Sequence, residues 1–157
     1  MASNARGPSL KGRALRYLAA REHSRAELQA KLARHAGDDE DPGAVARVLD
    51  ELAAKGFIDE ARVAESLLHR RAGRLGGARV MQELRAKGLP DEVLADAAER
   101  LRGTELARAR EVWRRKFGQP PRDAAERARQ LRFLGARGFS GDVARRALGG
   151  AGDDEDA

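Results

Sequence analysis

Apolar residues recur every three to four positions along most of the chain, the spacing that places them on one face of an α-helix. The clearest example is formed by Val45, Val48, Leu49 and Leu52, and Gly56 follows as a helix-ending residue. No segment alternates strictly between apolar and polar residues, and the β-branched residues that favour strands are scarce. The pattern therefore predicts an all-α fold.

Residues that commonly cap helices precede several of these apolar stripes. Ser24 followed by Glu27 has the form of a capping box. Asp41–Pro42 combines an N-cap residue with a proline suited to the first helical position. Asp123 and Ser140 stand at the start of two later helices in the same way. These caps support separate helices divided by short turns.

The chain also contains an internal repeat. Three stretches each place a leucine shortly before a glycine, at 28–37, 80–88 and 130–138. The leucines, Leu32, Leu84 and Leu134, are about 50 positions apart, a period typical of repeat proteins. We therefore predict three tandem three-helix repeats, stacked around a continuous core into an elongated, curved body. The predicted organisation is a disordered N-terminus (1–9), repeats at 10–56, 57–102 and 103–149, and a disordered acidic tail (150–157).

The second repeat opens with Phe57 and Ile58, which we expect to pack beside a helix at 59–73. Gly76–Gly77 is not followed by the lysine and hydroxyl residue of a phosphate-binding loop, so it is interpreted as a turn between helices. The last helix of this repeat is predicted to end near Leu101, and the third repeat to begin with a new helix near Thr104.

Composition changes this picture mainly through charge. Of the 157 residues 36% are charged and only 4% aromatic, and the formal net charge is +6. Basic segments alternate with acidic ones along the repeat, so stacking would align the basic helices into a stripe that suits a polyanion or an acidic protein surface. The predicted stripe consists of Lys11, Arg13, Arg16, Arg70, Arg71, Arg74, Arg114, Arg115, Lys116, Arg127, Arg132 and Arg137. The alternative is a set of solvated helix faces with cations near helix C-termini, where the helix dipole favours them.

Catalytic and metal-binding patterns are missing from the sequence. Cysteine is absent, and His23, His35 and His69 lack metal-ligand spacing, so all three are expected at the surface. The acidic stretch 38–41 lacks the alternation of oxygen ligands found in a calcium loop. No apolar run is long enough to span a membrane, and no signal-peptide core is present. We therefore expect a cytoplasmic, monomeric binding protein without cofactor or metal, rather than an enzyme.

Three blocks of the sequence carry a family resemblance. They are SRAEL with KL within 24–32, VLDEL with GFIDEARVAE within 48–65, and RKFG, ERARQLRFL and RGFS within 115–140. Together they resemble the RecX family of regulatory proteins, which modulate the RecA recombinase of bacteria. The acidic stretch 38–41 and the acidic tail depart from the family pattern.

The resemblance implies three tandem three-helix repeats that bind along the helical groove of the RecA–DNA filament, with DNA contacted weakly or through the filament. It implies inhibition of strand exchange, ATP hydrolysis and co-protease activity, and hence a role in DNA repair, homologous recombination and the SOS response. Two other interpretations stay open from the residues alone: a direct nucleic-acid binder, and a helical scaffold with no connection to DNA.

Overall fold

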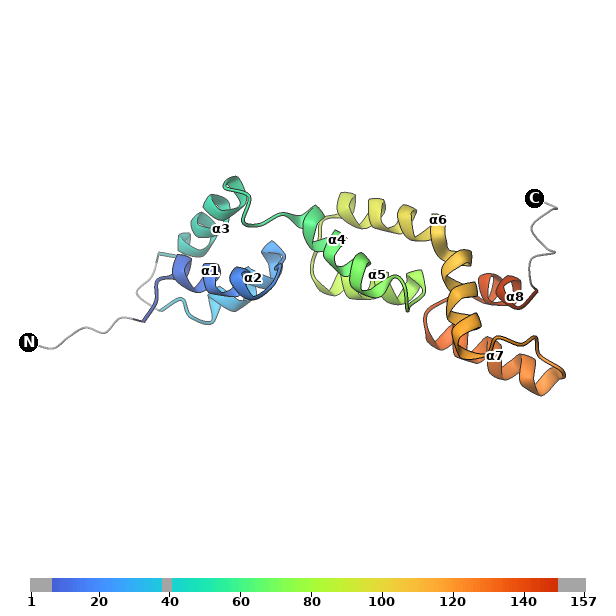
Figure 1. Ribbon diagram of the computed structural model, residues 1–157. Coiled ribbons are helices and arrows are strands. Elements are labelled where there is room, and N and C mark those ends of the chain that lie inside the picture. The colour runs from blue at the N-terminus through green and yellow to red at the C-terminus, as the bar shows by residue number, and fades with distance from the viewer. Residues whose placement is uncertain (1–6, 38–40, 150–157) are drawn as a thin grey trace, which may run out of the picture.

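The computed structural model describes residues 7–37 and 41–149, and within these ranges it contains eight helices and no strands. The helices are α1 (Leu10–Ala20), α2 (Arg25–Ala33), α3 (Ala44–Ala54), α4 (Glu60–Arg71), α5 (Gly77–Ala86), α6 (Asp91–Lys116), α7 (Ala124–Ala136) and α8 (Gly141–Gly149). They form an elongated row that turns at α6, with α1–α3 at one end and α7 and α8 at the other (Figure 1). The predicted acidic tail, residues 1–6 of the predicted N-terminal segment and residues 38–40 of the acidic stretch lie outside the described residues.

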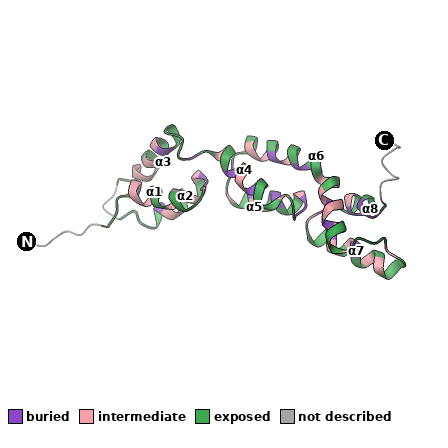
Figure 2. Cartoon of the chain, in the orientation of Figure 1, coloured by how far each residue is buried: buried purple, intermediate pink, exposed green. Residues whose placement is uncertain are grey.

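The helices gather into three units along the row. Unit 1 contains α1–α3, unit 2 contains α4, α5 and the first half of α6, and unit 3 contains the second half of α6 with α7 and α8. In the described part of the chain the buried apolar side chains form three separate clusters, one in each unit. Figure 2 colours the buried residues purple along the helices of all three units. The all-α fold of three helical repeats is thus confirmed, whereas the expectation of one continuous core is wrong.

Most predicted caps are present, with one exception. The Ser24 and Glu27 capping box forms as expected, and the Asp123 side chain accepts from the Glu126 backbone N–H. Helix α3, however, begins at Ala44 rather than at Pro42. The Asp41 carboxylate accepts from the Gly43 N–H at 3.0 Å, so this residue closes a turn ahead of the helix instead of capping it. The N-cap of α1 is Ser9, a residue included in the N-terminal segment 1–9 that we predict to be disordered.

The predicted break between the second and third repeats does not exist, because α6 runs unbroken through it. The weakest helix former near the expected break is Gly103, which costs about 1 kcal/mol relative to alanine in a helix. Both halves of α6 have a core to pack against: Leu101 is buried in unit 2 and Ala109 in unit 3. Packing on both sides therefore outweighs the glycine, and the helix bends between the halves instead of ending (Figure 1).

Units 2 and 3 also meet where two backbones touch. The Gly76 N–H donates to the Arg137 carbonyl oxygen at 2.7 Å, and a Cβ atom added to Gly76 would collide with the backbone of Gly138 and Phe139. Gly76 is the N-cap of α5 but has no side chain to cap with, so Glu105 of α6 accepts from the Gly77 N–H at 3.0 Å instead. This contact fixes the end of α7 against the start of α5.

Units 1 and 2 are joined through polar groups. The Ser24 hydroxyl, at the start of α2, donates to the Lys87 carbonyl oxygen at the end of α5 at 2.5 Å. This bond is the counterpart of the one between Gly76 and Arg137, so the middle helices of the three units meet head to tail. Arg62 of α4 adds an ion pair with Glu22 at 2.6 Å across the junction.

Two residues near this junction lie elsewhere than predicted. Ile58 is buried, but in the core of unit 1 and not beside α4. Phe57 is 47% exposed, so it contributes little to either core. The chain thus remains part of unit 1 for two residues beyond Gly56, whose positive φ of 80° ends the preceding turn.

His23 contradicts the prediction that all three histidines lie at the surface, because it is only 1% exposed. Its Nδ1 lies 3.0 Å from the Arg21 carbonyl oxygen, and its Nε2 lies 2.8 Å from the Lys31 ammonium, which also sits over the Tyr17 ring at 4.7 Å. These contacts require a neutral imidazole that donates through Nδ1 and accepts at Nε2. Burial lowers the pKa of His23 from 6.5, outweighing the raising effect of the bond to Arg21. His35 and His69 are exposed, as expected.

Acid should therefore destabilise unit 1 through His23. A lowered pKa means that the unfolded chain binds the proton first, so the free energy of unfolding falls as the pH drops below 6.5, by at most about 1.4 kcal/mol per pH unit for one proton. Urea unfolding of the wild type and of His23→Gln between pH 7.5 and 5.5 measures this, and the variant should show the flatter dependence. Parallel curves for the two proteins would exclude His23 as the titrating group.

Candidate functional site

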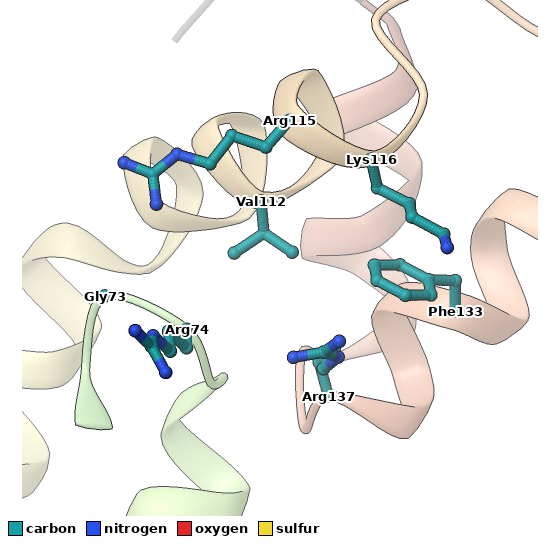
Figure 3. Close-up of a pocket in the computed structure, with 7 residues that line it drawn as sticks. All are labelled: Gly73, Arg74, Val112, Arg115, Lys116, Phe133 and Arg137. Carbon is teal, nitrogen blue, oxygen red and sulfur yellow. The ribbon is translucent and has the colours of Figure 1, made fainter.

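The junction of units 2 and 3 carries a cleft of about 230 Å³ with basic residues around an apolar floor. Its lining comes from the turn after α4, the end of α6 and the end of α7, and consists of Gly73, Arg74, Val112, Arg115, Lys116, Phe133 and Arg137 (Figure 3). Val112 and Phe133 supply the apolar part. The cleft is therefore shared by two repeats and does not exist in either alone.

The cleft continues into a larger depression of about 600 Å³ between α4 and α6. This depression shares three lining residues with the cleft, Gly73, Arg74 and Arg115, and adds His69, Arg70, Thr104, Ala107, Arg108 and Glu111. We call the cleft and the depression together the junction groove. Basic side chains from α4, from the following turn, from α6 and from the end of α7 line the junction groove.

The positive charge of the junction groove is only partly neutralised. Glu111 is the one acidic residue in its described lining, and it binds Arg115 at 3.0 Å and Arg114 at 2.7 Å. Arg108 is largely buried and paired with Glu105 at 2.6 Å. The remaining cations form no ion pair with any residue that the structure describes: Arg70, Arg74, Lys116 and Arg137. The groove therefore presents a surplus of positive charge in a concave site, an arrangement that suits an anionic ligand.

Arg108 fixes the turn after α4, which forms one side of the junction groove. Its guanidinium donates to the carbonyl oxygens of Ala72 at 2.9 Å and Leu75 at 2.6 Å, in the turn that carries Arg74. Across the groove, Arg137 is held because its carbonyl oxygen accepts a hydrogen bond from the Gly76 N–H. The fold thus fixes the backbones that carry the two arginines, although their like charges repel each other.

The junction groove collects five of the residues predicted to form the basic stripe: Arg70, Arg74, Arg115, Lys116 and Arg137. The other predicted residues lie outside it. Three of these are in ion pairs: Lys11 with Glu51 at 2.6 Å, Arg71 with Glu83 at 3.4 Å, and Arg114 with Glu111. Arg13 and Arg16 belong to α1 in unit 1, and Arg127 and Arg132 are exposed on α7 without lining the groove.

Sequence reasoning missed the apolar members of the groove. Phe133 lies in the last turn of an arginine-rich helix, and an aromatic residue among cations was an available signal. Val112 carried no such signal, because it reads as an ordinary core position of α6 and is in fact buried in the unit 3 cluster.

Fold and site together define an elongated helical-repeat protein with a basic groove at a repeat junction. No group of acidic or histidine side chains suited to a metal ion occurs within 7–37 and 41–149. None of the helices described for this chain combines the length and apolarity needed to cross a bilayer. The class is that of a helical-repeat protein built from tandem three-helix units.

Comparison with known proteins identifies the family. Models of the first, second and third three-helix domains of RecX match residues 11–52, 59–97 and 104–148. The chain is 60% identical to the regulatory protein RecX of Leptothrix cholodnii, over 94% of this chain and 92% of that protein. It is 51% identical to the regulatory protein RecX of Ralstonia nicotianae, over 91% and 88% of the two chains. This chain belongs to the RecX family of regulatory proteins.

Solved structures agree with this fold. The crystal structure of RecX from Lactobacillus salivarius superposes with a TM-score of 0.75 over 89% of this chain and 92% of that chain, at 19% sequence identity. A second crystal structure, of a regulatory protein RecX, gives a TM-score of 0.68 over 88% of this chain and 70% of that chain, at 23% identity. The helical arrangement is thus kept at low sequence identity.

Proposed function

We propose that this chain regulates a RecA recombinase by binding to the RecA–DNA filament, with the junction groove as a principal contact. Membership of the RecX family gives the class of partner. The observation that carries the proposal is the cluster of four cations without carboxylate partners, brought together from two repeats on an elongated frame. A filament of nucleic acid and protein offers repeated anionic groups to such a surface.

The proposed mechanism is obstruction by occupancy. Units 2 and 3 share α6 and the Gly76 contact, so they present the groove as one preformed surface. Several weak contacts along a long body add to a strong overall attachment. A bound chain then blocks incoming duplex DNA or the addition of RecA protomers, which lowers strand exchange, ATP hydrolysis and co-protease activity in DNA repair and the SOS response. The chain acts as a cytoplasmic monomer and needs no cofactor or catalysis of its own.

A strand-exchange assay on preassembled RecA filament tests the proposal. Adding increasing amounts of the full chain should reduce strand exchange and RecA ATP hydrolysis together, because both depend on the same filament. A gel shift with naked DNA at physiological salt serves as the control. Tight retardation of naked DNA without RecA would instead indicate a direct nucleic-acid binder, and no effect in either assay would indicate a scaffold with neither activity.

A further inference from the structure

Phe133 holds two of the unpaired cations of the junction groove at once. The Lys116 Nζ lies 5.5 Å and the Arg137 Cζ 4.9 Å from the centroid of its ring. Both distances fall within the range of a cation–π interaction. In the view of Figure 3 the ring lies between the two side chains, with Lys116 above it and Arg137 below it.

The ring itself is fixed from a third direction. Phe117, which ends α6, meets Phe133 edge to face, with centroids 5.4 Å apart and an interplanar angle of 86°. Phe133 is half-buried and packs against the core of unit 3. It also precedes Arg137 by four residues at the end of α7, the spacing at which helical side chains are neighbours. Phe133 is therefore an anchored platform and not a mobile surface side chain.

A ring and a carboxylate restrain a cation with different consequences. Glu111 restrains Arg115 but also cancels its charge towards a ligand. The Phe133 ring carries no net charge, so Lys116 and Arg137 keep theirs while their side chains lose rotamer freedom before any ligand arrives. Because Lys116 and Arg137 are already ordered, less conformational entropy is lost when a ligand binds.

We propose that Phe133 is a positioning residue of the junction groove, which holds Lys116 and Arg137 towards a bound anion without neutralising them. The proposal rests on the proposed function in so far as the groove binds an anionic partner. The proposal further assigns the preferred anion to phosphate, because a phosphate group offers three acceptor oxygens to cations that approach from several helices, whereas a carboxylate offers two. That phosphate belongs either to the nucleic-acid backbone or to a free polyphosphate.

Affinity measured across a range of salt separates positioning from charge. We expect Phe133→Leu to weaken filament binding about threefold to tenfold, because Lys116 and Arg137 are then no longer ordered before the ligand binds. The slope of log affinity against log salt should stay at the wild-type value, because that slope counts the cations engaged. Lys116→Ala should instead lower the slope by about one, and Phe133→Trp should restore affinity since tryptophan is the stronger platform.

Two measurements keep this inference separate from the proposed function. Ring-current shifts of the Lys116 and Arg137 side-chain protons, seen by NMR in the free protein, should disappear in Phe133→Leu while its circular dichroism stays unchanged. Titration with inorganic tripolyphosphate tests the groove without RecA and should show the same ranking of variants. Unchanged affinity for both ligands in a folded Phe133→Leu protein, or a slope reduced as in Lys116→Ala, overturns the positioning role. If tripolyphosphate binds with the expected ranking of variants and filament does not bind, the positioning role is supported and the proposed function is refuted. If filament binds and tripolyphosphate does not, the assignment to phosphate is overturned.

Discussion

Gly76→Ala is expected to lower the free energy of unfolding by about 3 kcal/mol, the upper part of the range for overpacking in a rigid environment. The backbone of Gly76, with φ −72° and ψ 162°, is one that alanine adopts readily, so conformational strain is not the cause. The cause is the collision of the new Cβ with the backbone of Gly138 and Phe139, which no side-chain movement can relieve. The junction must open, and the bond from the Gly76 N–H to Arg137 is lost with it.

Gly103→Ala is the matched control for this substitution. A Cβ at Gly103 meets no atom within 4 Å, and the residue lies inside α6, so alanine should stabilise the chain by roughly 0.5–1 kcal/mol. Urea unfolding of both variants and of the wild type gives the comparison. Equal stability of Gly76→Ala and Gly103→Ala would show that the two backbones are not in contact in solution.

The second large effect is expected on binding. Reversing Arg74 and Arg137 to glutamate replaces two unpaired cations of the junction groove by carboxylates. Charge-assisted contacts contribute about 1.5–3 kcal/mol each, so the double reversal should weaken filament binding by about 100-fold or more. The salt dependence of binding should fall as well, because fewer phosphate contacts release fewer counterions.

Arg127→Glu with Arg132→Glu provides the comparison for this experiment. It makes the same change in net charge on exposed positions of α7 that lie outside the groove. We expect a change of only a few fold, from long-range electrostatics alone. Fluorescence anisotropy with labelled filament measures both variants. An equal loss in the two would mean that the whole basic surface, and not the junction groove, makes the contact.

Much of the fold could be predicted because local signals specify it. The capping box at Ser24 and the apolar spacing from Val45 to Leu52 each determine a helix within a few residues, and both are present. The break expected between Leu101 and Thr104 was wrong because the cores of units 2 and 3 hold the two halves of α6 on either side of it. That reason is tertiary, and no local pattern shows it.

The site was less predictable than the fold, because it depends on tertiary contacts that local sequence patterns do not show. The sequence identifies which segments are basic but not which cations find carboxylates, since Lys11 meets Glu51 and Arg71 meets Glu83 through folding alone. His23 was predicted at the surface and is buried, because nothing in the charged sequence around it indicates burial. The groove depends on how units 2 and 3 pack against each other, and no local sequence pattern predicts that packing.

The shared helix α6 also affects how the chain loses its structure. Its first half contributes Leu101 to one core and its second half contributes Ala109 to the next, so melting either core frays the helix that supports the other. Units 2 and 3 therefore form a single cooperative folding block. Unit 1, attached through polar bonds and with a core of its own, can unfold while that block stays intact.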